Sequence, residues 1–220
     1  MVMLASASPV HAQIAPLPAD DSLPAAPVAP PPNRDPRDLS GNWKASPQQG
    51  FANATVRFDD NLVRDCLPQF SAVVASMSDA AHESVTEFVQ TPRLLLIVFQ
   101  VGPIVREIRM DGTHPANLVP SDTGDSIGHW QGDTLVVETT GVKGRLRPDG
   151  PELSPRFVMT ERLRKVEGGS VLEDRISFHD PAGEELPPPY TVRLNWAAPR
   201  HILEWICEDD GEDYFNPDKK

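Results

Sequence analysis

The sequence predicts an all-β, mainly antiparallel fold that closes into a barrel and carries one short helix. Several segments alternate apolar and polar residues with period two, as strands with one buried face and one wet face do. Turn signals such as Gly102-Pro103 and Asp111-Gly112 separate these segments. Many short strands with tight turns are typical of a sandwich or barrel, and not of alternating strand–helix units.

The expected elements follow one another after Gly41. One helix is expected over residues 67–84. The expected strands are 42–45, 55–58, 93–101, 104–110, 126–130, 134–140, 156–166, 171–179, 190–196 and 201–207. The last two pairs, 156–179 and 190–207, are expected to form hairpins of a meander that closes the barrel.

Period two also assigns the strand faces in the second half of the chain. Two of the apolar faces include a carboxylate, Glu161 in one strand and Asp174 in the next. The residues predicted to share a face are Phe157, Met159, Glu161 and Leu163, then Leu172, Asp174, Ile176 and Phe178, then Tyr190, Val192, Leu194 and Trp196.

The stretch SIGHWQGDTLVVETTG, residues 126–141, predicts a hairpin. A two-residue turn at Gln131-Gly132 is expected because glycine readily adopts positive φ. His129 and Glu138 then share a face but lie roughly 13 Å apart, so a direct acid–base pair within the hairpin is not expected. The expected register pairs Trp130 with Asp133, His129 with Thr134, and Ile127 with Val136.

Two interpretations stay open for each titratable residue of this hairpin. His129 is either satisfied by Thr134 across the strands or is a proton-transfer residue. Glu138 either has a structural role, in an ion pair with Arg106 or Arg109 of the neighbouring hairpin or on the solvent-facing side of the sheet, or faces inward as a buried acid with a raised pKa. Trp130 is expected in the core or at its rim.

Composition and charge exclude several partners. The formal net charge is −12 and the isoelectric point is near 4.8. Such a surface repels phosphate backbones and anionic lipids, so nucleic acid is not an expected partner. No apolar run reaches the 18 or so residues that a spanning helix needs, so membrane insertion is not expected.

The N-terminus predicts export to the periplasm or beyond the cell. Residues 1–12 end in Val10-His11-Ala12, which fits the end of a signal peptide whose true start lies upstream of Met1; the alternative is an alanine-rich start without structure. Residues 13–37 are rich in Pro and Ala and are expected to be a disordered linker. The barrel domain is expected over 38–208, and 209–220 form an acidic C-terminal tail.

The two cysteines, Cys66 and Cys207, are expected to form a disulfide in an oxidising compartment. The bridge would close a loop of about 140 residues and contribute roughly 4–5 kcal/mol in the chain-entropy model. The alternative is two separate buried thiols. Neither cysteine belongs to a C-x-x-C motif, so zinc is not expected.

The hairpin stretch resembles the signature S-(I/V)-G-(H/R)-W-E-G-D-T-L-V-V-(E/D)-T of a large family of secreted bacterial proteins without an established activity. Shorter matching pieces occur in order over about 38–208, among them Cys66-Leu67-Pro68. Gly41-Asn42-Trp43 is also similar to the first-strand motif of lipocalins. The resemblance implies export and a lipocalin-like, calycin-type β-barrel, and it implies no reaction. Gln131 departs from the family, which often has Glu at this position.

Three functions stay open, and whether the protein is an enzyme stays open with them. The first is a periplasmic barrel that binds a small, largely apolar molecule in its interior. The second is a barrel lyase, isomerase or hydrolase that uses Glu138, Glu161 or His129 as acid or base. The third is a structural envelope domain. The candidate ligand-binding residues are Trp130, Arg145, Arg147, His114 and Trp205.

No cofactor or metal is expected. The chain has no P-loop, G-x-G-x-x-G, H-E-x-x-H or G-x-S-x-G motif, and its six histidines lack ligand spacing. The closely spaced Arg145 and Arg147 could meet a carboxylate or phosphate of a ligand, or could balance nearby acids.

Overall fold

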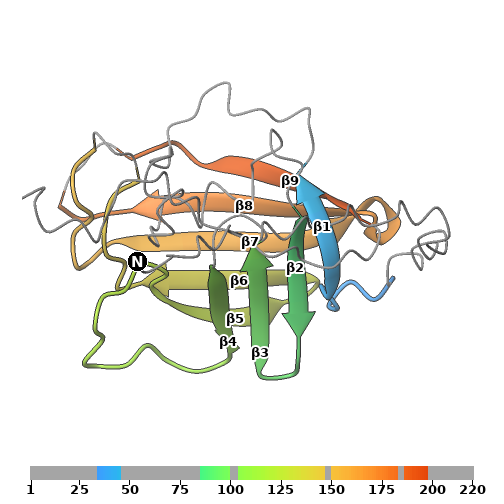
Figure 1. Cartoon of the computed structure of the whole chain (residues 1–220), viewed down its shortest axis with the longest axis horizontal. Coiled ribbons are helices and arrows are strands. Elements are labelled where there is room, and N and C mark those ends of the chain that lie inside the picture. The colour runs from blue at the N-terminus through green and yellow to red at the C-terminus, as the bar shows by residue number, and fades with distance from the viewer. Residues whose placement is uncertain (1–33, 46–84, 100–103, 147–149, 183–185, 198–220) are drawn as a thin grey trace, which may run out of the picture.

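Each strand pairs with the next along the chain, and the last pairs back onto the first, so that the sheet closes into a barrel (Figure 1). This computed structural model describes residues 34–45, 85–99, 104–146, 150–182 and 186–197. The strands in these ranges are β1 (Gly41–Ala45), β2 (Val85–Gln90), β3 (Leu94–Phe99), β4 (Val105–Met110), β5 (Asp125–Gln131), β6 (Thr134–Thr140), β7 (Val158–Val166), β8 (Val171–His179) and β9 (Tyr190–Trp196).

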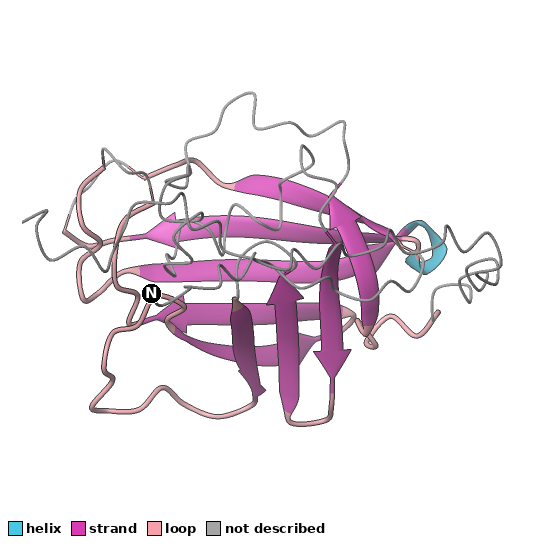
Figure 2. Ribbon diagram, in the orientation of Figure 1, coloured by secondary structure: helices cyan, strands magenta, loops and turns pink. Residues whose placement is uncertain are grey.

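The all-β prediction is confirmed, and β6, β8 and β9 begin and end where the sequence places them. The strand β2 is not among the predicted elements. In the described part of the chain the only helical element is a three-residue 3-10 turn, Glu167–Gly169 (Figure 2). The predicted helix 67–84, the strands 55–58 and 201–207, the N-terminal segments 1–12 and 13–33, and the tail 209–220 lie outside the described residues.

The β5–β6 hairpin has a different register from the predicted one. Its turn is Gly132-Asp133, with Gly132 at φ 61°. His129 therefore lies opposite Val136, and not opposite Thr134, while Ile127 lies opposite Glu138. The predicted strand faces are nevertheless correct. Each residue of β5 lies opposite a residue of β6 two positions further along than predicted, and a shift of two preserves the alternation of faces.

The inward faces form one apolar core. Trp43 lies fully buried within it, donates its indole N–H to the Leu39 carbonyl at 2.9 Å, and meets Trp196 edge-to-face at 5.2 Å between ring centroids. The predicted faces of β7, β8 and β9 all point into this core. Its other large members include Phe88, Leu95, Ile97, Ile108, Leu135, Phe157, Met159, Leu163 and Leu172.

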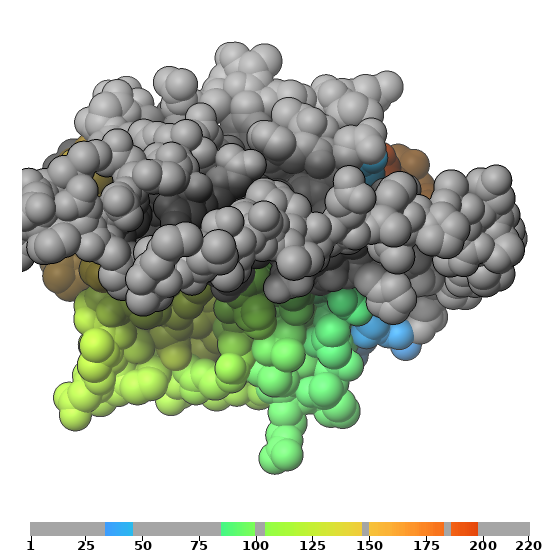
Figure 3. Space-filling view, viewed as in Figure 1, coloured from blue at the N-terminus to red at the C-terminus, as the bar shows by residue number. Residues whose placement is uncertain are grey.

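One strand pair, β4 with β5, is parallel, whereas all other neighbours are antiparallel. Parallel neighbours need a connection that returns to the starting end of the sheet. Residues 111–124 provide it on the outside of the barrel, where Figure 3 shows them in yellow-green beside the green β2–β3 turn. The connection is held at its end because Ser121 bridges to Val142 and Leu118 packs against Gly141.

Candidate functional site

A row of polar side chains crosses the inside of the barrel over five consecutive strands. We call it the interior polar row. Each member is at most 2% exposed. Barrel strands are tilted, so residues that are diagonal in register come to similar heights inside. The members are Arg106 on β4, Ser126 on β5, Thr139 on β6, Glu161 on β7 and Asp174 on β8.

Arg106 crosses beneath β5 and β6 to reach Glu161. Its Nη1 donates to Glu161 Oε1 at 2.7 Å, and its Nη2 contacts Glu161 Oε2, which makes the pair bidentate. Nη2 also donates to Thr139 Oγ1 at 2.8 Å, and Nε lies 3.3 Å from Ser126 Oγ. Two carboxylate oxygens and two hydroxyls therefore surround one guanidinium. Bidentate geometry is the strongest form of such a pair, and it commits the charge of Arg106 to Glu161.

Asp174 is the second carboxyl of the row, and it has no such partner. It is fully buried, and neither of its side-chain oxygens makes a hydrogen bond of good geometry among the described residues, where its weaker polar contacts are with the Glu161 carboxyl and the backbone N–H of Arg162. Burial raises the pKa of Asp174 well above its usual range, and the charge and polar contact of Glu161 raise it further, while Arg106 and the backbone N–H of Arg162 act in the opposite direction. Buried polar groups in native structures nearly always have a protein, water or ligand partner, so this carboxyl marks a candidate binding position.

An aromatic group lies beside Asp174. Asp174 is opposite Val192 on β9, and Tyr190 is the next inward residue of β9. Tyr190 lies 6.1 Å from Phe178, which is stacked on Phe157 at 5.9 Å, between ring centroids. Burial raises the pKa of the Tyr190 hydroxyl, and the negative charges of Asp174 and Glu161 raise it further, so the phenol stays neutral.

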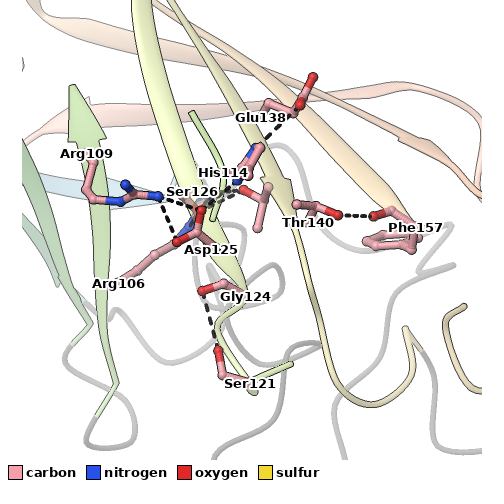
Figure 4. A network of polar contacts seen from close by, with 11 residues as sticks. Arg106, Arg109, His114, Ser121, Gly124, Asp125, Ser126, Glu138, Thr140 and Phe157 are labelled. Atoms are coloured by element: carbon pink, nitrogen blue, oxygen red, sulfur yellow. Dashed lines mark hydrogen bonds and ion pairs between the residues drawn. The ribbon is translucent and has the colours of Figure 1, made fainter. Parts of the chain in front are cut away.

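A second polar network lies on the outside of the same strands (Figure 4). Asp125 at the start of β5 accepts two hydrogen bonds from Arg109 Nη2, at 2.7 and 2.9 Å. His114 of the outer connection places Nδ1 2.6 Å from Asp125 Oδ1, and its Nε2 is 3.4 Å from Glu138 Oε1. We call these four residues the outer network.

The outer network includes an Asp–His pair like those that orient a catalytic histidine. Its His114 Nε2 is buried and has no hydrogen-bond partner among the described residues, so no described hydroxyl or thiol is positioned there as a nucleophile. Glu138 covers that nitrogen while remaining 55% exposed itself. The outer network is therefore a surface cluster of charges without a third catalytic group in the described residues.

The three predicted proton-transfer residues lie apart. Glu161 is inside the barrel, whereas Glu138 and His129 are on the outside. Glu138 lies on the solvent-facing side of the sheet, as its structural interpretation allowed, but it does not pair with Arg106 or Arg109, because Arg106 binds Glu161 and Arg109 binds Asp125. The inward alternative for Glu138 is wrong as well, because its face is the outer one.

His129 contacts Gln131, not the predicted Thr134, with 2.9 Å between His129 Nε2 and Gln131 Nε2. This follows from the shifted register, which places Val136 opposite His129.

The predicted ligand-binding residues are also dispersed. Trp130 is half-buried against the core, with the Arg37 guanidinium 6.0 Å from its ring centroid. Arg145 is 46% exposed and reaches the Gly150 carbonyl at 3.2 Å and Glu152 at 3.4 Å, so it balances its own loop. His114 belongs to the outer network. The residues outside the described ranges are Arg147, Trp205, Cys66 and Cys207, so their roles and the disulfide stay predictions.

Sequence reasoning missed Arg106 and Asp174 as members of one site. The available signal was a charged residue at period two with apolar neighbours, as in Arg106, Ile108 and Met110 of β4. The same signal marks Asp174 between Leu172 and Ile176. The hydroxyls of Ser126 and Thr139 carry no comparable signal, because such residues are common on strands.

In the described ranges, no group of three or more His, Cys, Asp or Glu side chains is arranged to hold a metal ion. Those ranges also contain no helix with the length and apolar character to cross a membrane. Comparison with family models and with curated proteins finds no match for this chain, so its resemblance to the secreted bacterial family stays a prediction.

Proposed function

We propose that this protein is exported to the periplasm or secreted, and that its barrel interior binds a small, largely apolar molecule. The observation that carries the proposal is Asp174, a fully buried carboxyl whose oxygens make no hydrogen bond of good geometry among the described residues. A bound molecule with one polar end would supply such a bond. The inward surface around it is otherwise mostly apolar, which favours an apolar body for the same molecule.

Energetics separate this function from a purely structural barrel. Burying charged groups is costly, and replacing a buried ion pair by apolar residues is often neutral or stabilising. A barrel that serves only as scaffold gains no stability from an additional unpaired carboxyl next to the Arg106–Glu161 pair. The polar row therefore supports a role in recognition.

The enzyme alternative loses the support it had from the hairpin. Glu138 and His129 lie on the outer surface, and Glu161 is held by Arg106. A general acid or base needs to reach the reacting proton within hydrogen-bond distance. These three residues cannot act on one molecule in the described arrangement, so binding is the better-supported function.

Native mass spectrometry tests the proposal. The full chain is expressed with export to a periplasm, and its mass is recorded before and after denaturation. We expect a non-covalent organic adduct in the native spectrum that disappears on denaturation. Asp125→Asn, on the outer surface, should retain the adduct, while Asp174→Leu should lose it. A wild-type protein without any adduct, and without affinity for an apolar fluorescent probe, would support the structural alternative instead.

A further inference from the structure

We infer that the molecule bound inside the barrel carries a cationic amine and that Asp174 is its counter-ion. This inference rests on the proposed function and names the chemical class of its ligand. It places the amine on the β8 side of the Arg106–Glu161 pair, with the apolar part of the ligand among the core side chains.

The charge count of the interior is the first argument. Among the described buried side chains, the inward charged groups are Arg106, Glu161 and Asp174, which gives two carboxyls for one guanidinium. The bidentate contact assigns Arg106 to Glu161. Ionised groups are tolerated in an apolar interior only when they are paired. The raised pKa of Asp174 favours its neutral form, which balances the row without ligand. A cationic ligand can take the place of that proton and pair with the Asp174 carboxylate, whereas an anionic ligand would add a further negative group.

The surroundings of Asp174 are the second argument. Tyr190 is the inward residue of β9 nearest in register after Val192, which lies opposite Asp174, and Phe178 lies 6.1 Å from Tyr190 between ring centroids; aromatic rings attract ammonium groups. The net charge of −12 draws cations toward the protein over long range. Both features favour an ammonium over a neutral polar group.

Binding would be linked to one proton. The titratable and charged groups facing Asp174 are Glu161 from β7, Arg106 from β4 and Tyr190 from β9, while its inward neighbours on β8 are Leu172 and Ile176. Without ligand, burial and the neighbouring Glu161 carboxylate favour the protonated form of Asp174. When an ammonium binds, that O–H bond breaks, the proton goes to solvent, and the carboxylate pairs with the cation. Affinity should therefore rise with pH until the ligand amine itself loses its proton.

Three probes with the same alkyl chain test the inference: n-octylammonium, n-octanol and n-octanoate, titrated into the full chain by calorimetry. We expect octylammonium to bind at least about tenfold more tightly than octanol, and octanoate to bind most weakly. The affinity for octylammonium should rise with pH over the range in which free Asp174 is protonated, by up to about tenfold per pH unit and with up to one proton released per molecule bound. The affinity for octanol should change little.

Asp174→Asn preserves the size of the side chain and removes its charge. It should lower the affinity for octylammonium at least about tenfold and abolish its pH dependence, while octanol binding persists as evidence that the interior is intact. Asp125→Asn is the matched control and should bind like wild type. Equal affinities for the three probes, or a preference for octanol or octanoate, would overturn the cationic ligand and leave interior binding in place. Failure of every probe to bind, together with no native adduct, would overturn the proposed function itself.

Discussion

Arg106 and Arg109 lie three residues apart on β4 and have opposite environments. Arg106 points inward, is 1% exposed and holds Glu161, whereas Arg109 points outward, is 38% exposed and holds Asp125. Both make two hydrogen bonds to a carboxylate. The inner pair has given up its hydration and depends on its partner, while the outer pair keeps water as an alternative partner. Similar contacts on one strand should therefore have very different consequences when broken.

The largest effect is expected from breaking the inner pair on one side. Arg106→Met leaves Glu161 buried without its cation and should lower the free energy of unfolding by about 3–5 kcal/mol. The double variant Arg106→Met, Glu161→Met should recover most of that loss, because no unpaired charge remains. Urea denaturation followed by circular dichroism measures both. A single variant within about 1 kcal/mol of wild type would show that the inner pair behaves like an exposed one.

Asp174→Asn tests the unpaired member of the interior polar row through the pH dependence of stability. The pKa of Asp174 is raised in the folded state, so the folded protein binds this proton more tightly than the unfolded chain does. As pH rises above the unfolded-state value of about 3.9, wild type should lose stability relative to the Asn variant. Thermal melts at a series of pH values measure the difference. A difference that stays constant with pH would contradict the buried, protonated carboxyl.

A smaller effect is expected from the outer pair. Asp125→Asn removes the carboxylate that holds both Arg109 and His114, yet it should cost no more than about 1 kcal/mol of unfolding free energy. Added salt should reduce that cost further, because salt screens exposed charges. Urea denaturation at low and high salt provides the measurement. A loss as large as that of Arg106→Met would erase the contrast between the two networks.

The smallest effect is expected from Glu138→Gln. Glu138 is 55% exposed and its contact with His114 Nε2 is 3.4 Å long. The variant should stay within about 0.5 kcal/mol of wild type, as surface substitutions usually do. The same denaturation measurement applies, and a clear destabilisation would mean that the outer network supports the 111–124 connection more strongly than its exposure indicates.

Local patterns predicted the barrel well, because a period of two depends only on neighbouring residues. It placed Glu161 and Asp174 on inward faces from the sequence alone. The period-two pattern did not reveal β2, because apolar side chains occupy both faces of this strand. Phe88 points into the core, while Val85 and Val89 are on the other side.

Pairing between distant strands could not be read from the same patterns. The Arg106–Glu161 contact joins residues 55 positions apart and spans two intervening strands, so it depends on the register of β4, β5, β6 and β7 together. The hairpin register itself depends on whether the turn uses Gly132 as its first or second residue. Because the turn begins one residue later than predicted, the residue opposite His129 is Val136 and not Thr134. Neighbouring residues therefore suffice to predict which face of a strand is buried, whereas a site formed by several strands depends on their pairing.

The closure of the barrel by β1 and β9 also has a mechanical consequence. Trp43 lies opposite Trp196, and Ala197 N donates to Asn42 O at 2.8 Å, so the start of β1 and the end of β9 lie side by side. Pulling the start of β1 away from the end of β9 would load the hydrogen bonds between these two strands one after another, so the strands would peel apart. Tension across the β7–β8 pair in the strand direction would load many bonds at once. The barrel should therefore open under low force at the β1–β9 seam, while the strands that carry Glu161 and Asp174 remain paired.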